Sequence, residues 1–213
     1  MDTDSLIRTL AAEVPSVPRR SVGRRIAWGL GAGGLVTVAL IGLGLGFRPD
    51  LGLAMRGYPF LVKWTYTISL AIAAVVAVLR LARPDAGTLR WMWLLAVPVG
   101  ALAAISGVEM ASVPARDWLA MWLGHSWRLC PMLVLTLSLP IFIGLLWSFR
   151  RLAPTRLRAA GAAAGLAAGA CAATLYCLHC PEVSALFVLT WYTLGIALAA
   201  AFGALVGPRF LRW

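Results

Sequence analysis

Three cysteines in this chain have a spacing that could support thiol chemistry. Cys177 and Cys180 form a C-x-x-C motif, and Cys130 lies in a separate Cys-Pro context. A C-x-x-C spacing can lower the pKa of a thiol and support reversible disulfide exchange. One hypothesis is therefore a quinone-linked membrane thiol-disulfide oxidoreductase that uses this motif. Such an enzyme usually relays electrons through a second cysteine pair, and only Cys130 remains near the motif, so we expect no enzymatic activity.

The same cysteines, together with histidine, could instead bind a metal. Cys130, Cys180 and His179 offer the sulfur and nitrogen ligands that suit Cu(I), Zn(II) or Cd(II), and Cys177 and His125 are predicted to lie at the same boundary. A third interpretation is a disulfide from Cys130 to either Cys180 or Cys177, which could be a structural staple and a reducible switch at once. We expect a sensor with at most a transient metal, and no permanently bound cofactor.

Six long apolar runs must position these residues. The chain is 61% hydrophobic and 13% charged, whereas about a quarter of the residues in a soluble domain are charged. A run of about 20 apolar residues spans a bilayer as a helix, because each span must satisfy its own backbone hydrogen bonds. We therefore predict an all-α membrane protein, with a six-helix transmembrane sensor domain over residues 26–213 and a short cytoplasmic tail over residues 1–25. The predicted spans are Ile26–Phe47, Phe60–Leu81, Trp91–Met110, Cys130–Phe149, Leu157–Cys177 and Ala185–Val206.

The basic residues predict which side of the membrane each loop faces. Most of the 19 lysines and arginines lie in the tail, after the second and fourth spans, and at the C-terminus. Such residues are enriched on the cytoplasmic side. Both termini are therefore predicted to be cytoplasmic, in a bacterial inner membrane, and Cys130, Cys177 and Cys180 to face the oxidising outer side. Since topology accounts for the net charge of +11, we expect no direct contact with nucleic acid.

Other residues predict how the spans pack. Lys63, at the outer end of the second span, is expected to extend its ammonium group towards the headgroups. In the fifth span, small residues recur four apart from Gly161 to Gly169, which favours close packing within the bundle, and Cys171 there is expected to be a packing residue. The Trp-rich connection over residues 116–127 predicts a short helix at the membrane surface.

The tail contains a segment that could hold a protein partner. Its apolar residues recur at a helical spacing over about two turns, and Pro15 follows them. So short a helix is marginal alone and is expected to order on a partner. Its acidic polar face suits anionic lipid poorly, so we predict a protein partner that holds the apolar stripe in a groove. The stripe is formed by Leu6, Ile7, Leu10 and Val14.

Several segments together resemble the NrsF family, the six-span anti-sigma factors that hold extracytoplasmic-function (ECF) sigma factors in proteobacteria. The resemblance covers essentially the whole chain, and the two cysteine contexts are its most specific part. The matching segments are Thr3-Asp4-Ser5-Leu6-Ile7-Arg8-Thr9-Leu10-Ala11, Ser126-Trp127-Arg128-Leu129-Cys130, Ala153-Pro154, Leu175-Tyr176-Cys177-Leu178-His179-Cys180-Pro181-Glu182 and Trp191-Tyr192.

The resemblance implies a membrane-embedded anti-sigma factor. The N-terminal segment would bind the ECF sigma factor and keep it from RNA polymerase. Cys130 and Cys180 would sense metal or oxidant stress and trigger its release. Cys177 is not one of the pair that the resemblance implies.

Overall fold

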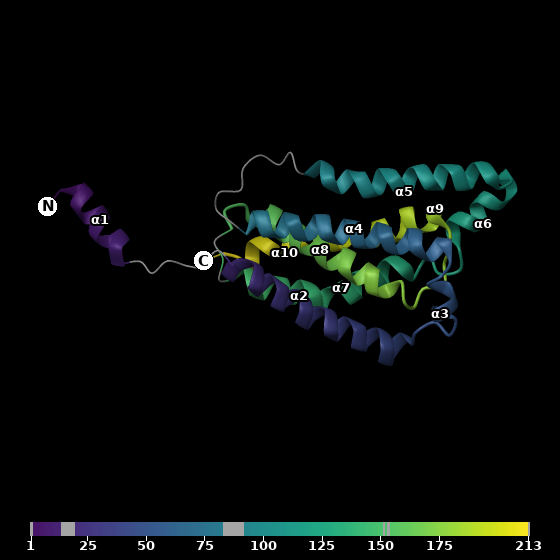
Figure 1. Ribbon diagram of the computed structural model, residues 1–213, viewed down its shortest axis with the longest axis horizontal. Coiled ribbons are helices and arrows are strands. Elements are labelled where there is room, and N and C mark those ends of the chain that lie inside the picture. Colours follow the sequence, from purple (N-terminus) through teal and green to yellow (C-terminus); the bar gives the residue numbers. More distant parts are fainter. Residues whose placement is uncertain (1, 14–19, 83–91, 151, 153, 213) are drawn as a thin grey trace.

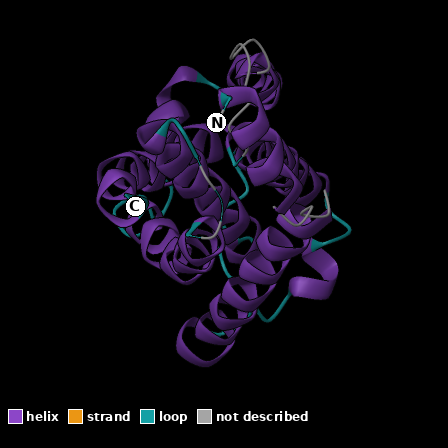
Figure 2. Ribbon diagram, turned by 90° about the vertical axis from the view of Figure 1, so that its left-hand side faces the viewer, coloured by secondary structure: helices purple, strands orange, loops and turns teal. Residues whose placement is uncertain are grey.

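The computed structural model describes residues 2–13, 20–82, 92–150, 152 and 154–212. Over these residues all the regular structure is helical (Figure 2), which confirms the predicted all-α class. Six helices are long and apolar enough to cross a membrane, and they match the predicted spans to within a few residues at each end. These are Val22–Leu45, Tyr58–Leu81, Trp93–Ser112, Cys130–Phe149, Leu157–Tyr176 and Ala185–Phe210.

Shorter elements connect or extend the six long helices. A π-helical turn over Ile41–Leu45 extends α2, and another over Val188–Tyr192 joins α9 to α10. The short helix predicted between the third and fourth spans is present as α6. The helices are α1 (Thr3–Glu13), α2 (Arg20–Leu40), α3 (Leu51–Ala54), α4 (Tyr58–Leu81), α5 (Trp93–Ser112), α6 (Trp118–Leu123), α7 (Cys130–Phe149), α8 (Leu157–Tyr176), α9 (Ala185–Phe187) and α10 (Thr193–Phe210).

Helix α8 forms the centre of the bundle. Buried residues make up 67% of its most apolar stretch, compared with 17% for α5 at the edge. Helices α10, α4 and α7 pack around α8, α2 lies along α7, and α5 lies along α4 (Figure 1). The small-residue face of α8 packs inside the bundle as predicted: a Cβ atom on Gly161 would collide with the carbonyl of Gly203, and one on Gly165 with that of Ala199. Helices α8 and α10 can approach so closely because neither has large side chains at the contact.

Helices α2 and α7 also meet through small and hydroxyl residues. Gly29 and Gly144 pack backbone against backbone. The hydroxyl of Thr37 donates to the carbonyl of Leu137 at 3.0 Å, across the two helices, and that of Ser148 donates to the carbonyl of Arg25 at 2.9 Å. Such bonds satisfy polar side chains away from water and join neighbouring helices.

The N-terminal helix α1 lies apart from the bundle in Figure 1, beyond the end where the C-terminus lies. Helices α3 and α6 mark the opposite end. Ile7 and Leu10 on α1 are 58% and 55% exposed. The predicted amphipathic helix is thus formed and two of its apolar side chains are free of the bundle. Val14 and the side chain of Leu6 lie outside the described part of the chain, and the cytoplasmic location of α1 stays a prediction.

Candidate thiol site

Three thiols gather at the end of the bundle opposite α1. Cys130 is the first residue of α7, and Cys177 and Cys180 belong to the segment that follows α8, which we call the thiol loop (residues 177–184). All three are fully buried free thiols. Cys130 lies close enough to Cys180 to be the main influence on the pKa of its thiol, whereas the thiol of Cys177 donates to the carbonyl of Ala173 at 3.2 Å. The structure therefore brings together the two cysteines that the family resemblance pairs.

The two cysteines of the thiol loop differ in their acidity. Hydrogen bonding with Cys130 lowers the pKa of the Cys180 thiol, and the nearby Lys63 ammonium lowers it further against the opposing effect of burial. Burial raises the pKa of Cys177 to about 11. Because the thiolate is the reactive form of cysteine, these opposite shifts in pKa favour Cys180 over Cys177 as the nucleophile.

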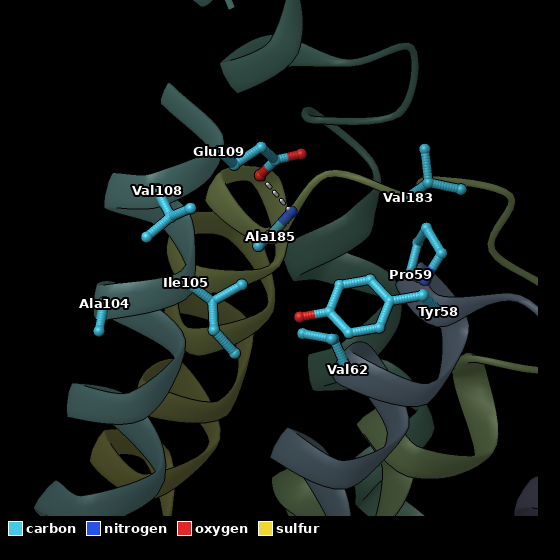
Figure 3. Close-up of a pocket in the computed structure, with 9 residues that line it drawn as sticks. All are labelled: Tyr58, Pro59, Val62, Ala104, Ile105, Val108, Glu109, Val183 and Ala185. Atoms are coloured by element: carbon cyan, nitrogen blue, oxygen red, sulfur yellow. Dashed lines mark hydrogen bonds between the residues drawn. The ribbon is translucent and has the colours of Figure 1, made fainter. Parts of the chain in front are cut away.

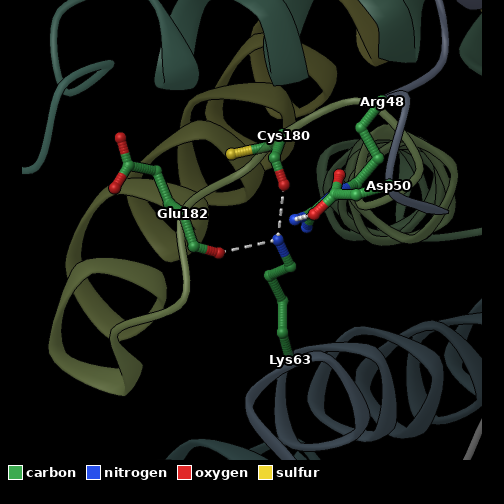
Figure 4. A network of polar contacts seen from close by, with 5 residues as sticks. All are labelled: Arg48, Asp50, Lys63, Cys180 and Glu182. Atoms are coloured by element: carbon green, nitrogen blue, oxygen red, sulfur yellow. Dashed lines mark hydrogen bonds and ion pairs between the residues drawn. The ribbon is translucent and has the colours of Figure 1, made fainter. Parts of the chain in front are cut away.

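Lys63 does not extend towards the headgroups, so that prediction is wrong. Its side chain is 2% exposed and turns inward, where its ammonium donates to the carbonyls of Cys180 and Glu182, both at 2.9 Å (Figure 4). The ring of Tyr192 lies 5.7 Å from the same nitrogen. Two backbone carbonyls replace water as hydrogen-bond acceptors, so the ammonium of Lys63 can be buried without losing its hydrogen bonds. The sequence signal was available: Lys63 lies within an apolar span, at the same end as the cysteines, whereas the other charged residue of that span, Arg80, lies at its opposite end.

Glu182 fastens the thiol loop to the turn before α7. One oxygen of its carboxylate accepts hydrogen bonds from the backbone N–H groups of His125 and Ser126, at 2.8 and 3.1 Å, and from the Ser126 hydroxyl at 3.1 Å. Gly124 lies against this carboxylate with a positive φ of 54°, and a Cβ atom there would lie 2.6 Å from it. Since Cys130 begins α7 shortly after this turn, Glu182 helps to set the position of one thiol relative to the other.

Glu109 on α5 fastens the other end of the thiol loop. Its carboxylate accepts hydrogen bonds from the backbone N–H groups of Ala185 and Leu186, at 2.8 and 3.3 Å, where α9 begins (Figure 3). A negative charge is favourable there because the first N–H groups of a helix lack partners. Glu109 also borders a largely apolar cavity of about 490 Å³ between α4 and α5. No local sequence pattern predicted the partners of either glutamate.

The predicted metal ligands are only partly brought together. His179 uses its ring Nδ1 to bond the carbonyl of Gly46 at 2.7 Å, and because a carbonyl only accepts, Nδ1 carries the proton. Within the described ranges, no three His, Cys, Asp or Glu side chains form a group that could hold a metal ion. Of the predicted ligands, His179 is therefore bonded through Nδ1 to the segment after the first span.

The end of the first span also contacts the thiol loop. The backbone N–H of Arg48 donates to the carbonyl of Leu178 at 3.2 Å. The Arg48 side chain forms a two-pronged ion pair with Asp50, with both N–O distances 2.7 Å. This pairing raises the pKa of Arg48 and lowers that of Asp50. The thiol loop is therefore bonded to the first span as well as to α4, α5 and the turn before α7.

Comparison with known proteins identifies relatives of full length. A family model described as NrsF, negative regulator of sigma F, matches residues 10–213. The chain is 42% identical over 218 residues to a probable anti-sigma-F factor NrsF of Azospira oryzae and 40% identical over 215 residues to an anti-sigma-F factor NrsF of Caulobacter vibrioides, and each alignment covers 100% of both chains. No solved structure matches the chain. The match over nearly the whole length shows that the chain belongs to the NrsF family.

Proposed function

We propose that this chain is a membrane-embedded anti-sigma factor for an ECF sigma factor. It binds the sigma factor through α1 and releases it when Cys130 and Cys180 react with an oxidant or a metal ion. Membership of a family described as negative regulators of sigma F is the observation that carries the regulatory role. The six apolar helices support a multi-pass membrane location, and the distribution of arginines supports the bacterial inner membrane with both termini in the cytoplasm.

The exposed apolar side chains of α1 support this helix as the binding segment. Ile7 and Leu10 are one turn apart and both exposed. An amphipathic helix that leaves such residues uncovered gains stability when they enter a groove on a partner, where burial of each contributes on the order of 1–3 kcal/mol. Attachment of α1 to a bundle with six apolar helices would hold the bound sigma factor at the membrane, away from RNA polymerase.

The buried thiol pair supports the sensor role. With peroxide as the oxidant, the Cys180 thiolate displaces one oxygen as hydroxide and forms a sulfenic acid; the Cys130 sulfur then displaces the second oxygen as water and closes the disulfide. Overall, two thiols lose two electrons and two protons, and peroxide becomes two waters. Thiophilic metal ions would instead displace the thiol protons. Either reaction can release the sigma factor only if the altered bundle binds it less tightly.

The oxidoreductase hypothesis gains no support from the site. Cys177 and Cys180 are both fully buried, and the Cys177 thiol bonds a backbone carbonyl of its own helix. A catalytic C-x-x-C needs at least one sulfur that a substrate dithiol can reach. A sensor that opens under strong stress tolerates buried thiols, so the regulatory function fits the geometry better.

Binding through α1 is tested by pull-down of the sigma factor on full-length protein in detergent. The double substitution Ile7→Asp and Leu10→Asp should abolish capture, because it places charges in the apolar contact. Ala12→Asp is the matched control, since it adds a charge to another exposed face of the same helix and should retain capture. Undiminished capture by the double variant would refute this binding mode.

The sensor role is tested by treating membranes that hold the complex with peroxide or cadmium. Cys130→Ser and Cys180→Ser should each keep the sigma factor bound, whereas Cys171→Ser, the control thiol within α8, should release it like the original chain. Release that continues unchanged in both serine variants would remove the pair from the mechanism.

A further inference from the structure

From the geometry we infer that Lys63 is a positioning residue: it holds Cys180 against Cys130 and links the thiol pair to α4. The first half of this inference concerns contacts at the thiol site and stands alone. The second half, that the link carries a signal, rests on the proposed function.

The two hydrogen bonds of Lys63 flank Pro181, the residue that follows Cys180. Its ammonium bonds the carbonyl of Cys180 and that of Glu182, so it spans Pro181 between them. Pro181 has no backbone N–H and a fixed φ, so this short stretch has few ways to bend. The Lys63 side chain of α4 thereby holds in place the backbone segment that carries the Cys180 thiol (Figure 4).

The ammonium has few other partners in the bundle. It is buried, and among the described residues no carboxylate lies within 4.0 Å of it. A buried cation is costly unless it keeps its hydrogen bonds. Its favourable contacts therefore depend on the thiol loop staying in place, and the loop depends on Lys63 in return.

This mutual dependence supplies a route from the thiols to the rest of the bundle. A disulfide or a metal at Cys180 moves its sulfur, and the attached backbone must follow. The two carbonyls then no longer fit the ammonium of Lys63, and α4 has to shift or turn to satisfy it. Because α4 packs along the central helix α8, a shift of α4 reaches the core of the bundle rather than a surface loop.

The experiment compares Lys63→Met with the original chain, both at full length in detergent. Diamide, which takes two electrons and two protons from a thiol pair, should give a Cys130–Cys180 disulfide on the order of tenfold more slowly in Lys63→Met, because the sulfurs are no longer held together. Maleimide at about pH 9, where the thiolate fraction changes little, should label Cys180 on the order of tenfold faster, because the loop opens more often. Peptide mapping assigns both products.

Two controls separate positioning from general destabilisation. Cys171 in the same molecules should keep its labelling rate, and Thr37→Val, which removes a buried bond between α2 and α7, should leave Cys180 unchanged. Lys63→Arg, which keeps the charge and donors, should restore part of the disulfide rate.

If Lys63→Met does not fold, Lys63→Arg and Lys63→Gln are compared in its place, and the variant that keeps the charge should cross-link faster. The inference would be overturned if Lys63→Met formed the disulfide and labelled Cys180 at the rates of the original chain. It would also be overturned if labelling of Cys171 rose as much as labelling of Cys180. In the fallback comparison, equal cross-linking of the Arg and Gln variants would overturn it.

The regulatory half has its own measurement. Oxidised Lys63→Met that still forms some disulfide should keep the sigma factor bound, since the link to α4 is cut; release at the level of the original chain would refute the link. If the chain captures no sigma factor at all, the proposed function fails, while the thiol measurements still decide the role of Lys63.

Discussion

At the scale of single residues, three buried groups give the thiol site its properties. Cys130 provides the hydrogen bond that most lowers the pKa of Cys180, and Lys63 provides a positive charge next to it. Cys177 lies in the same site but has a raised pKa because of its burial. The environment therefore lowers the pKa of one thiol and raises that of another, although the three cysteines have the same intrinsic chemistry.

The pH dependence of Cys180 follows from its lowered pKa. A free thiol titrates near pH 8.5, and a group whose folded pKa is lowered stabilises the fold fully above that value and loses the contribution as the pH falls towards the folded pKa. The ultraviolet absorbance of the thiolate should therefore persist below about pH 8.5 in the original chain and shift to higher pH in Cys130→Ala. Cys180→Ser should lack this absorbance, and Cys171→Ser should leave it unchanged. A midpoint unaffected by Cys130→Ala would contradict the hydrogen bond as its cause.

At the scale of elements, the contact between α8 and α10 depends on missing side chains. A Cβ atom on Gly161 would collide with the backbone of α10, whereas one on Gly107 of α5 would meet nothing within 4 Å. Both glycines lie within long apolar helices, so their hydropathy is similar and only their neighbours differ. Comparing Gly→Ala at positions 161 and 107 therefore separates the free-energy cost of overpacking from the effect of the substitution on the helix itself.

We expect Gly161→Ala to destabilise the bundle by about 1–3 kcal/mol, because a backbone contact must open. Gly107→Ala should be neutral or stabilising by up to about 1 kcal/mol, since alanine favours the helix and no neighbour is displaced. Unfolding in mixed detergent micelles measures both values. Equal effects of the two substitutions would show that α8 and α10 do not pack as described.

At the scale of the whole molecule, the thiols and α1 lie at opposite ends of the structure. Figure 1 places α1 and the C-terminus at one end and α3 and α6 at the other. The thiol loop contacts the segment after the first span, α4, α5 and the turn before α7. A change at the thiols can therefore reach several helices at once.

Reporter fusions test the predicted orientation of this bundle. A fluorescent protein that folds only in the cytoplasm should be bright at either terminus, because the basic residues favour that side for both. A phosphatase that is active only outside the inner membrane should be active when inserted after Gly124 and inactive at the C-terminus. The reverse pattern would invert the topology and place the thiols in the reducing cytoplasm.

Much of this architecture could be predicted from the sequence because hydropathy and charge act locally. A run of apolar residues is sufficient to predict a spanning helix, and the six predicted spans lie within a few residues of those observed. Glycine recurrence in the fifth span likewise predicted close packing, but not that α10 is the partner. The tail stripe was evident from spacing alone, and Ile7 and Leu10 are exposed as a binding surface requires.

Local patterns in the sequence are sufficient to predict the helices, the placement of cysteines at span ends and the amphipathic tail, since each depends on neighbours along the chain. That Cys180, rather than Cys177, interacts most strongly with Cys130 follows only from the packing of the thiol loop against α7. The tertiary structure also decided that Lys63 turns inward and that Glu109 and Glu182 bond the ends of the thiol loop. Those contacts join residues far apart in the chain, and their energies depend on distances that no local pattern encodes.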